Sequence, residues 1–214
     1  KPGAWKDRDK KYGEFESVDE DQRLAHLWVV DVESKKTRRV TKGSFTVGSF
    51  DWSPDGKALA FDHTINPDPS NGHTADISVV AVADGMVRPL VTQAGPDNRP
   101  LWSPDGTRVA FSSAMAQPFF YYTNSRIAVI PAAGGAITEL TKAFDENPGP
   151  IAWLKDGILF SASQKTAAHL FLLDPATGAV KQITPAGPWI FSNFTFTPDG
   201  SALAFVRTGP KEFP

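Results

Sequence analysis

The chain repeats one short sequence motif. An aromatic residue, a turn and a short apolar strand recur in that order at intervals of about 43 to 51 residues. The aromatic positions are Trp52, Trp102, Trp153 and Phe196. Repeats of this length are typical of folds in which one supersecondary unit stacks against copies of itself.

The turn inside this motif predicts a β-hairpin. In Ser53-Pro54-Asp55-Gly56, proline presets φ, serine and aspartate can bond to the neighbouring backbone, and glycine accepts a positive φ. The Asp-Gly pair returns at 105–106, 156–157 and 199–200. Each repeat resolves into four short β-rich runs, so we expect one four-stranded antiparallel sheet per repeat.

A second set of strands predicts how these sheets pack. Four runs are apolar at nearly every position instead of alternating: 28–32, 77–82, 127–130 and 170–173. Such strands are buried on both faces, so the sheets must stack face to face. Radial stacking gives an all-β fold, the β-propeller. A flat β-sandwich is the alternative.

The repeat boundaries predict three full four-stranded blades, at 48–91, 99–141 and 149–184. Residues 25–41 supply the outer half of an earlier blade, and residues 193–207 supply the inner half of a later one. We therefore expect a partial β-propeller domain over 25–214, after a charged N-terminal segment, 1–24, that forms a solvated strand or arm. The open blade edges should cause self-association, or the two halves should pair.

Composition excludes several classes of function. The net charge of -2 offers no basic field for nucleic acid, and no apolar run is long enough for a membrane span. There is no cysteine for a disulfide or a thiolate nucleophile. The four histidines lack metal-ligand spacing, and we read the polar stretch 62–76 as a surface insert instead of a calcium loop. No metal or other cofactor is expected.

Three segments that contain the repeated motif or its neighbouring strand resemble a known family. HLWVVDV (26–32), FDWSPDGKALAFDH (50–63) and PLWSPDGTRVAFSS (100–113) are similar to the N-terminal propeller of bacterial prolyl oligopeptidase family members, of the dipeptidyl-aminopeptidase and acylaminoacyl-peptidase kind. The resemblance implies a serine peptidase whose propeller caps an α/β-hydrolase domain and admits short peptides. It also implies a periplasmic or secreted location in a bacterium.

This chain lacks the catalytic half of such an enzyme, because no G-x-S-x-G nucleophile elbow occurs in it. We expect no catalytic residue here. The repeat also occurs in TolB-type interaction scaffolds and in oligogalacturonate-lyase-like propellers, which are the alternatives. The long inserts at 62–75 and 112–126 favour the peptidase, because TolB-type repeats are nearly uniform in length.

Candidate substrate-binding residues are expected on the face opposite the hairpins. The aromatic insert contains Phe119, Phe120, Tyr121 and Tyr122, which form either a local minicore or a contact surface for substrate or the catalytic domain. Trp189 should lie on the same face. The resemblance implies that an acidic pair, Asp145 and Glu146, holds the ammonium group of a peptide's N-terminus. The alternative for this pair is a solvated acidic loop.

Overall fold

The computed structural model describes residues 3–13, 23–197 and 200–209. Residues Gly3–Tyr12 form helix α1. The expectation of a strand is therefore wrong for these residues, and that of a solvated arm stays a prediction. Their sequence, GAWKDRDKKY, contains no β-branched residue and is rich in lysine, which favours a helix. Two short 3₁₀ helices, η1 (Pro69–Thr74) and η2 (Phe120–Tyr122), lie in the two long inserts.

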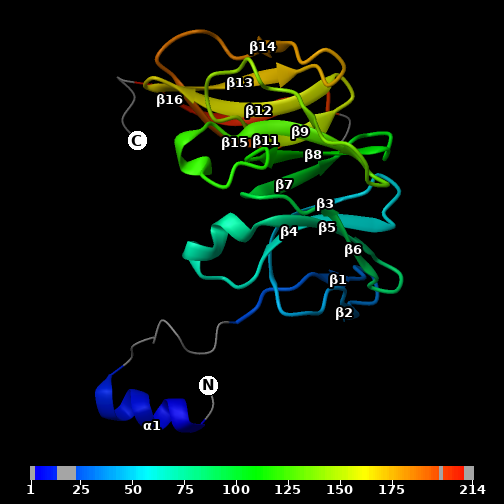
Figure 1. Ribbon diagram of the computed structural model, residues 1–214, viewed down its shortest axis with the longest axis vertical. Coiled ribbons are helices and arrows are strands. Elements are labelled where there is room, and N and C mark those ends of the chain that lie inside the picture. Colours follow the sequence, from blue (N-terminus) through cyan, green and yellow to red (C-terminus); the bar gives the residue numbers. More distant parts are fainter. Residues whose placement is uncertain (1–2, 14–22, 198–199, 210–214) are drawn as a thin grey trace.

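The rest of the described chain forms sheets that stack along the molecule (Figure 1). Their strands pair antiparallel, except for one parallel pairing of Ala168 with Ile190. The strands of the first full blade are β3 (Thr46–Trp52), β4 (Ala58–Thr64), β5 (Asp76–Ala81) and β6 (Val87–Val91). Those of the second are β7 (Asp97–Trp102), β8 (Arg108–Ser113), β9 (Arg126–Pro131) and β10 (Thr138–Glu139). Those of the third are β11 (Gly149–Leu154), β12 (Gly157–Gln164), β13 (Ala167–Leu173) and β14 (Val180–Gln182). In each blade the strands pair in sequence order, so the three predicted blades are confirmed.

Half blades flank the three full ones, as expected. Strand β1 (Trp28–Val30) pairs with β2 (Thr37–Arg39), and β15 (Ile190–Phe196) pairs with β16 (Leu203–Thr208). The two halves do not pair with each other in the described part of the chain, so the arc is open and the expected closure is absent. Self-association through the open edges stays a prediction.

The turn chemistry read from the sequence is present in the hairpins. The hydroxyl of Ser53 donates to the Asp55 carboxylate at 2.7 Å and accepts from the Ala58 N–H at 2.9 Å. Gly56 has a φ of 69°, a value that glycine adopts without strain. The second hairpin repeats these contacts through Ser103 and Asp105, at 2.6 Å. Each turn is thus determined by contacts within about five residues.

Adjacent blades are joined at one recurrent place, where the third strand of one blade meets the first strand of the next. The joints are Ala25 O to Val47 N at 3.0 Å, Ala75 O to Asp97 N at 2.8 Å, Ser125 N to Asn147 Oδ1 at 2.8 Å, and Ala168 N to Trp189 O at 3.0 Å. The third joint uses a side chain where the others use backbone. This joint lies at the candidate site.

The core lies between the stacked sheets. Phe61, Phe111 and Phe160 occupy the second strand of successive blades, and each is fully buried. Around them pack the strands that the sequence showed as continuous apolar runs, including Ile77, Ile127 and Leu170 at 0% exposure. Burial of both faces of each central strand confirms the β-propeller packing and excludes the sandwich arrangement.

Candidate functional site

The loops of each blade emerge on two opposite edges of the arc. The tight hairpins after β3, β7 and β11 lie on one edge, and the inserts containing η1 and η2 lie on the other (Figure 1). The loops between blades also lie on the insert side, because strands alternate in direction. We call this side the insert face. It carries all of the predicted site residues, as the strand directions required.

A cavity of about 240 Å³ opens on the insert face, between the second and third blades. Its wall includes three carboxamides, Asn98, Asn124 and Asn147, together with hydroxyl groups and the ring of Phe120. Among the described residues, no charged side chain lines it directly, but the Asp145 carboxylate lies beside it and accepts from the Asn124 amide. We call it the amide cavity.

A wider hollow of about 440 Å³ lies between the third blade and the final half blade. Glu146, Lys165 and His169 contribute to its lining, together with Pro188 beside the predicted Trp189. We call it the second hollow. It differs from the amide cavity because it contains charged groups of both signs.

The acidic pair lies between these two spaces. Asp145 is exposed and accepts a hydrogen bond from the Asn124 amide at 3.3 Å, at the wall of the amide cavity. Glu146 is half-buried and lines the second hollow. The two carboxylates therefore have different surroundings, and only Glu146 fits the expectation of a partly buried anion.

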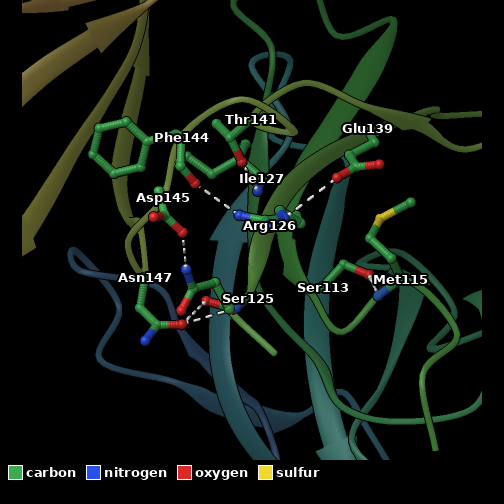
Figure 2. A network of polar contacts seen from close by, with 11 residues as sticks. Ser113, Met115, Ser125, Arg126, Ile127, Glu139, Thr141, Phe144, Asp145 and Asn147 are labelled. Atoms are coloured by element: carbon green, nitrogen blue, oxygen red, sulfur yellow. Dashed lines mark hydrogen bonds and ion pairs between the residues drawn. The ribbon is translucent and has the colours of Figure 1, made fainter. Parts of the chain in front are cut away.

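Arg126 holds the loop that carries the pair (Figure 2). One guanidinium N–H donates to the carbonyl oxygen of Phe144 at 2.7 Å, and Nε forms an ion pair with Glu139 at 3.4 Å. The Phe144 ring packs edge-on against Phe160, with ring centroids 5.2 Å apart. The acidic loop is thus fixed both to a strand and to the core of the third blade.

The aromatic insert does not form the minicore that was the first of the two expectations. Phe119, Tyr121 and Tyr122 are 75%, 74% and 89% exposed. Only Phe120 turns inward, where it lines the amide cavity and packs on Tyr121 with centroids 4.0 Å apart. The insert sits outside the blade stack, so no second sheet covers its rings. What remains of the two expectations is the contact surface, which stays a prediction.

Trp189 lies at the last joint of the arc and is half-buried. The guanidinium carbon of Arg207 is 4.3 Å from the centroid of its ring, a cation–π distance. The structure therefore places Asp145 beside the amide cavity, which Phe120 lines, and Glu146 with the Trp189 segment at the second hollow. The expected residues share one face without sharing one pocket.

The polar insert 62–76 divides into two parts. Its middle is a surface turn, in which the Asp68 carboxylate accepts from the Ser70 N–H at 2.8 Å. Asp62, however, is only 7% exposed and accepts backbone N–H groups from Ser49 at 3.2 Å and from Arg99 at 2.8 Å. The expectation of a surface insert is wrong for Asp62, because it bridges the first and second blades.

Sequence reasoning missed the carboxamides of the amide cavity. A signal was available, because Asn98 and Ser112 occupy the places in the second blade that Gly48 and Asp62 occupy in the first.

Among the residues that the structure describes, no cluster of three or more His, Cys, Asp or Glu side chains could hold a metal ion. No helix in the same residues is long and apolar enough to cross a bilayer.

The histidines each have a polar neighbour that explains their presence. His26 lies 3.2 Å from the Thr41 hydroxyl and His169 lies 3.1 Å from that of Thr184, at equivalent places in their blades. Both threonine hydroxyls also accept the N–H that follows the histidine, Leu27 at 2.9 Å and Leu170 at 3.2 Å. These two histidines are parts of the blade structure.

Comparison with known proteins gives peptidases as relatives in sequence. The chain is 29% identical over 143 residues to dipeptidyl-peptidase 5 of Porphyromonas gingivalis, covering 64% of this chain and 21% of that protein. It is 22% identical over 192 residues to the uncharacterized peptidase YuxL of Bacillus subtilis, covering 87% and 26%. It is 27% identical over 168 residues to a probable dipeptidyl-peptidase 5 of Aspergillus niger, covering 72% and 22%. The chain thus spans about a quarter of the length of these relatives. No protein-family model matches it.

Solved structures share the fold at lower identity. TolB from Acinetobacter baumannii superposes with a TM-score of 0.66 at 18% identity, over 87% of this chain and 44% of TolB. A puromycin-hydrolyzing peptidase of Mycobacterium tuberculosis gives 0.63 at 16% identity, over 85% and 32%. An oligogalacturonate lyase in complex with manganese gives 0.64 at 18% identity, over 84% and 52%. At these identities the likeness shows the fold alone.

The blades, the joints and the sequence relatives agree with the resemblance seen in the repeated motif. The chain is a homologue of peptidases named dipeptidyl-peptidase 5 and YuxL, and it folds as part of a β-propeller.

Proposed function

We propose that this chain is the non-catalytic propeller portion of a serine peptidase of the prolyl oligopeptidase family. In this proposal its insert face filters peptide substrates and docks a separate α/β-hydrolase domain. The sequence relationship to named peptidases supports the family. The observation that supports the site is the exposure of Phe119, Tyr121 and Tyr122, since exposed aromatic clusters mark interaction surfaces.

A TolB-type scaffold for protein–protein contact is the second candidate. The likeness to TolB in fold is as good as the likeness to the peptidases, so the fold does not separate the two. The inserts containing η1 and η2 favour the peptidase, because they make the repeats unequal in length. The third blade has no such insert, since only two residues connect β12 with β13.

The complete coding sequence and its product test the proposal. We expect the frame to continue into a G-x-S-x-G elbow followed by Asp and then His. The full-length protein should release nitroaniline from aminoacyl-nitroanilides, and a serine-directed inhibitor should stop it. Residues 1–214 alone should give no turnover, because they contain no nucleophile elbow. A frame that ends shortly after Pro214, or turnover by the isolated chain, would contradict the proposal.

The acidic pair gives a prediction for the full-length enzyme. Replacing Asp145 and Glu146 together with alanine should lower kcat/KM for substrates with a free N-terminus by about tenfold, because a partly buried carboxylate paired with an ammonium contributes more than an exposed one. N-acetylated substrates should be affected less than twofold.

Asp156 supplies the matched control for this experiment. It is an exposed acidic residue in the hairpin between β11 and β12, on the edge opposite the insert face. Asp156→Ala should leave both substrate classes unchanged. Equal losses on free and blocked substrates in the double variant would remove the pair as the ammonium site.

A further inference from the structure

The amide cavity lies where a polar bridge between blades is missing. Between the first and second blades, the Asp62 carboxylate crosses the joint and accepts the Arg99 N–H at 2.8 Å. This crossing needs a glycine at position 48, because a Cβ there would lie 2.1 Å from an Asp62 carboxylate oxygen. The side chain of Asp62 thus fills the joint between the first and second blades.

The second blade has the opposite arrangement at the same register. Ser112 stands in the place of Asp62, and Asn98 stands in the place of Gly48. The serine side chain is too short to cross to the third blade, and both residues line the amide cavity instead. Neither side chain has a hydrogen-bond partner among the described residues. The cavity is therefore a consequence of this substitution between repeats, and the polar groups of these two side chains are not bound to other described side chains.

The opposite wall of the cavity presents a fixed donor and a fixed acceptor. Oδ1 of Asn147 accepts the Ser125 N–H at 2.8 Å, which leaves its NH₂ group unused (Figure 2). The amide nitrogen of Asn124 donates to Asp145 at 3.3 Å, which leaves its carbonyl oxygen as an acceptor. Both amides are oriented by these bonds, so the site is formed in advance of any ligand.

The lining determines the class of ligand. None of the described residues that line it is charged, and the Asp145 carboxylate beside it already accepts from the Asn124 amide. An ionic group would therefore lose its hydration there without gaining a counter-charge from the lining. A peptide unit carries one donor and one acceptor and no charge, which matches the carboxamides of Asn98, Asn124 and Asn147. At about 240 Å³ the cavity is smaller than drug-sized sites of ~300–1,000 Å³, so it suits one residue of a chain. Sugar stacking is disfavoured, because Tyr121 packs on the Phe120 ring with centroids 4.0 Å apart.

We propose that the amide cavity binds one uncharged residue of an extended peptide, through the carboxamides of Asn98, Asn124 and Asn147. The proposal rests on the proposed function, since it gives the insert face a defined peptide subsite. It adds that recognition there is by the backbone and is neutral, separate from any ammonium binding by the acidic pair.

The test is a titration of the isotope-labelled chain with N-acetyl-alanyl-alanine methylamide, followed by nuclear magnetic resonance. We expect shifts concentrated on the side-chain amides of Asn98, Asn124 and Asn147. Asn98→Ala should weaken binding about fivefold without changing Tm, because it removes ligand hydrogen bonds and no internal one. Ser112→Asp places a carboxylate in the cavity, because Asn98 blocks the crossing that Asp62 makes beside Gly48. It should weaken binding at least about tenfold, by filling the cavity with charge.

Gln117→Ala is the control, since this exposed carboxamide belongs to the same insert but does not line the cavity. It should bind the peptide as the unchanged chain does. Shifts confined to the second hollow, the absence of shifts, or a response to methyl glucoside but not to peptide would each overturn the proposal. Failure here together with a serine peptidase activity of the full-length protein would leave the proposed function standing. Binding here with a frame that lacks a hydrolase domain would instead remove the proposed function.

Discussion

Phe160→Ala should lower the free energy of unfolding by about 3–5 kcal/mol. Phe160 is fully buried, stacks on Phe171 at 5.2 Å and meets Phe144 edge-on at 5.2 Å. Truncation loses the transfer free energy of the ring and leaves a cavity that β-strands held by hydrogen bonds on both sides cannot close. The measurement is a urea titration followed by tryptophan fluorescence.

The same substitution at an exposed phenylalanine is the control. Phe119→Ala should change stability by less than about 0.5 kcal/mol, because that ring is 75% exposed. Because Phe144 also anchors the acidic loop, Phe160→Ala should in addition speed amide hydrogen exchange at residues 144–147. A loss from Phe119→Ala as large as that from Phe160→Ala would mean that the aromatic insert packs after all.

Asp97→Asn should stabilise the chain at neutral pH and above. Burial raises the pKa of the Asp97 carboxyl from 3.8 to about 6, and the nearby Asp76 charge acts in the same direction. Hydrogen bonds from Ser113 and Gln93 oppose this rise, but one carboxylate oxygen, Oδ2, has no partner among the described residues. Between about pH 4 and pH 6, Asp97 in the folded chain therefore holds a proton that it has already released in the unfolded chain.

The sign of the pH dependence follows from this difference. The stability associated with Asp97 is fully present below about pH 4 and is lost as the pH rises through about 6, a change of about 3 kcal/mol. Asparagine keeps the shape of the side chain and carries no charge at any pH. The variant should match the unchanged chain near pH 4 and exceed its stability by up to about 3 kcal/mol at pH 8.

Urea titrations of both proteins from pH 4 to pH 8 measure this difference. Burial also raises the pKa values of Asp51 and Asp76, but both residues are present in each protein. The difference between the two curves therefore reports Asp97 together with its electrostatic coupling to Asp76. Parallel curves over the whole range would show that folding does not raise the pKa of the Asp97 carboxyl.

The candidate site could be predicted only in part. The direction of the strands determines which edge each loop reaches, so the placement of Asp145, Phe120 and Trp189 on one face followed from the order of the elements. Whether an aromatic insert is packed or exposed depends on what covers it, and the sequence of the insert is the same in both cases. The exposure of Tyr122 at 89% therefore came from the structure.

The blades follow from local features of the sequence. Hairpins such as Ser53 to Ala58 are made by hydrogen bonds across at most five positions, and the continuous apolar strands must be covered on both faces. The burial and the partners of Asp62 and Asp97, by contrast, depend on how the blades pack together. The partner of Asp62 is 37 positions away in another blade, and nothing near a polar residue in the sequence reveals such a partner. The amide cavity arises in the same way, because it depends on two residues, Asn98 and Ser112, that meet only when neighbouring strands pair and a third blade packs against them.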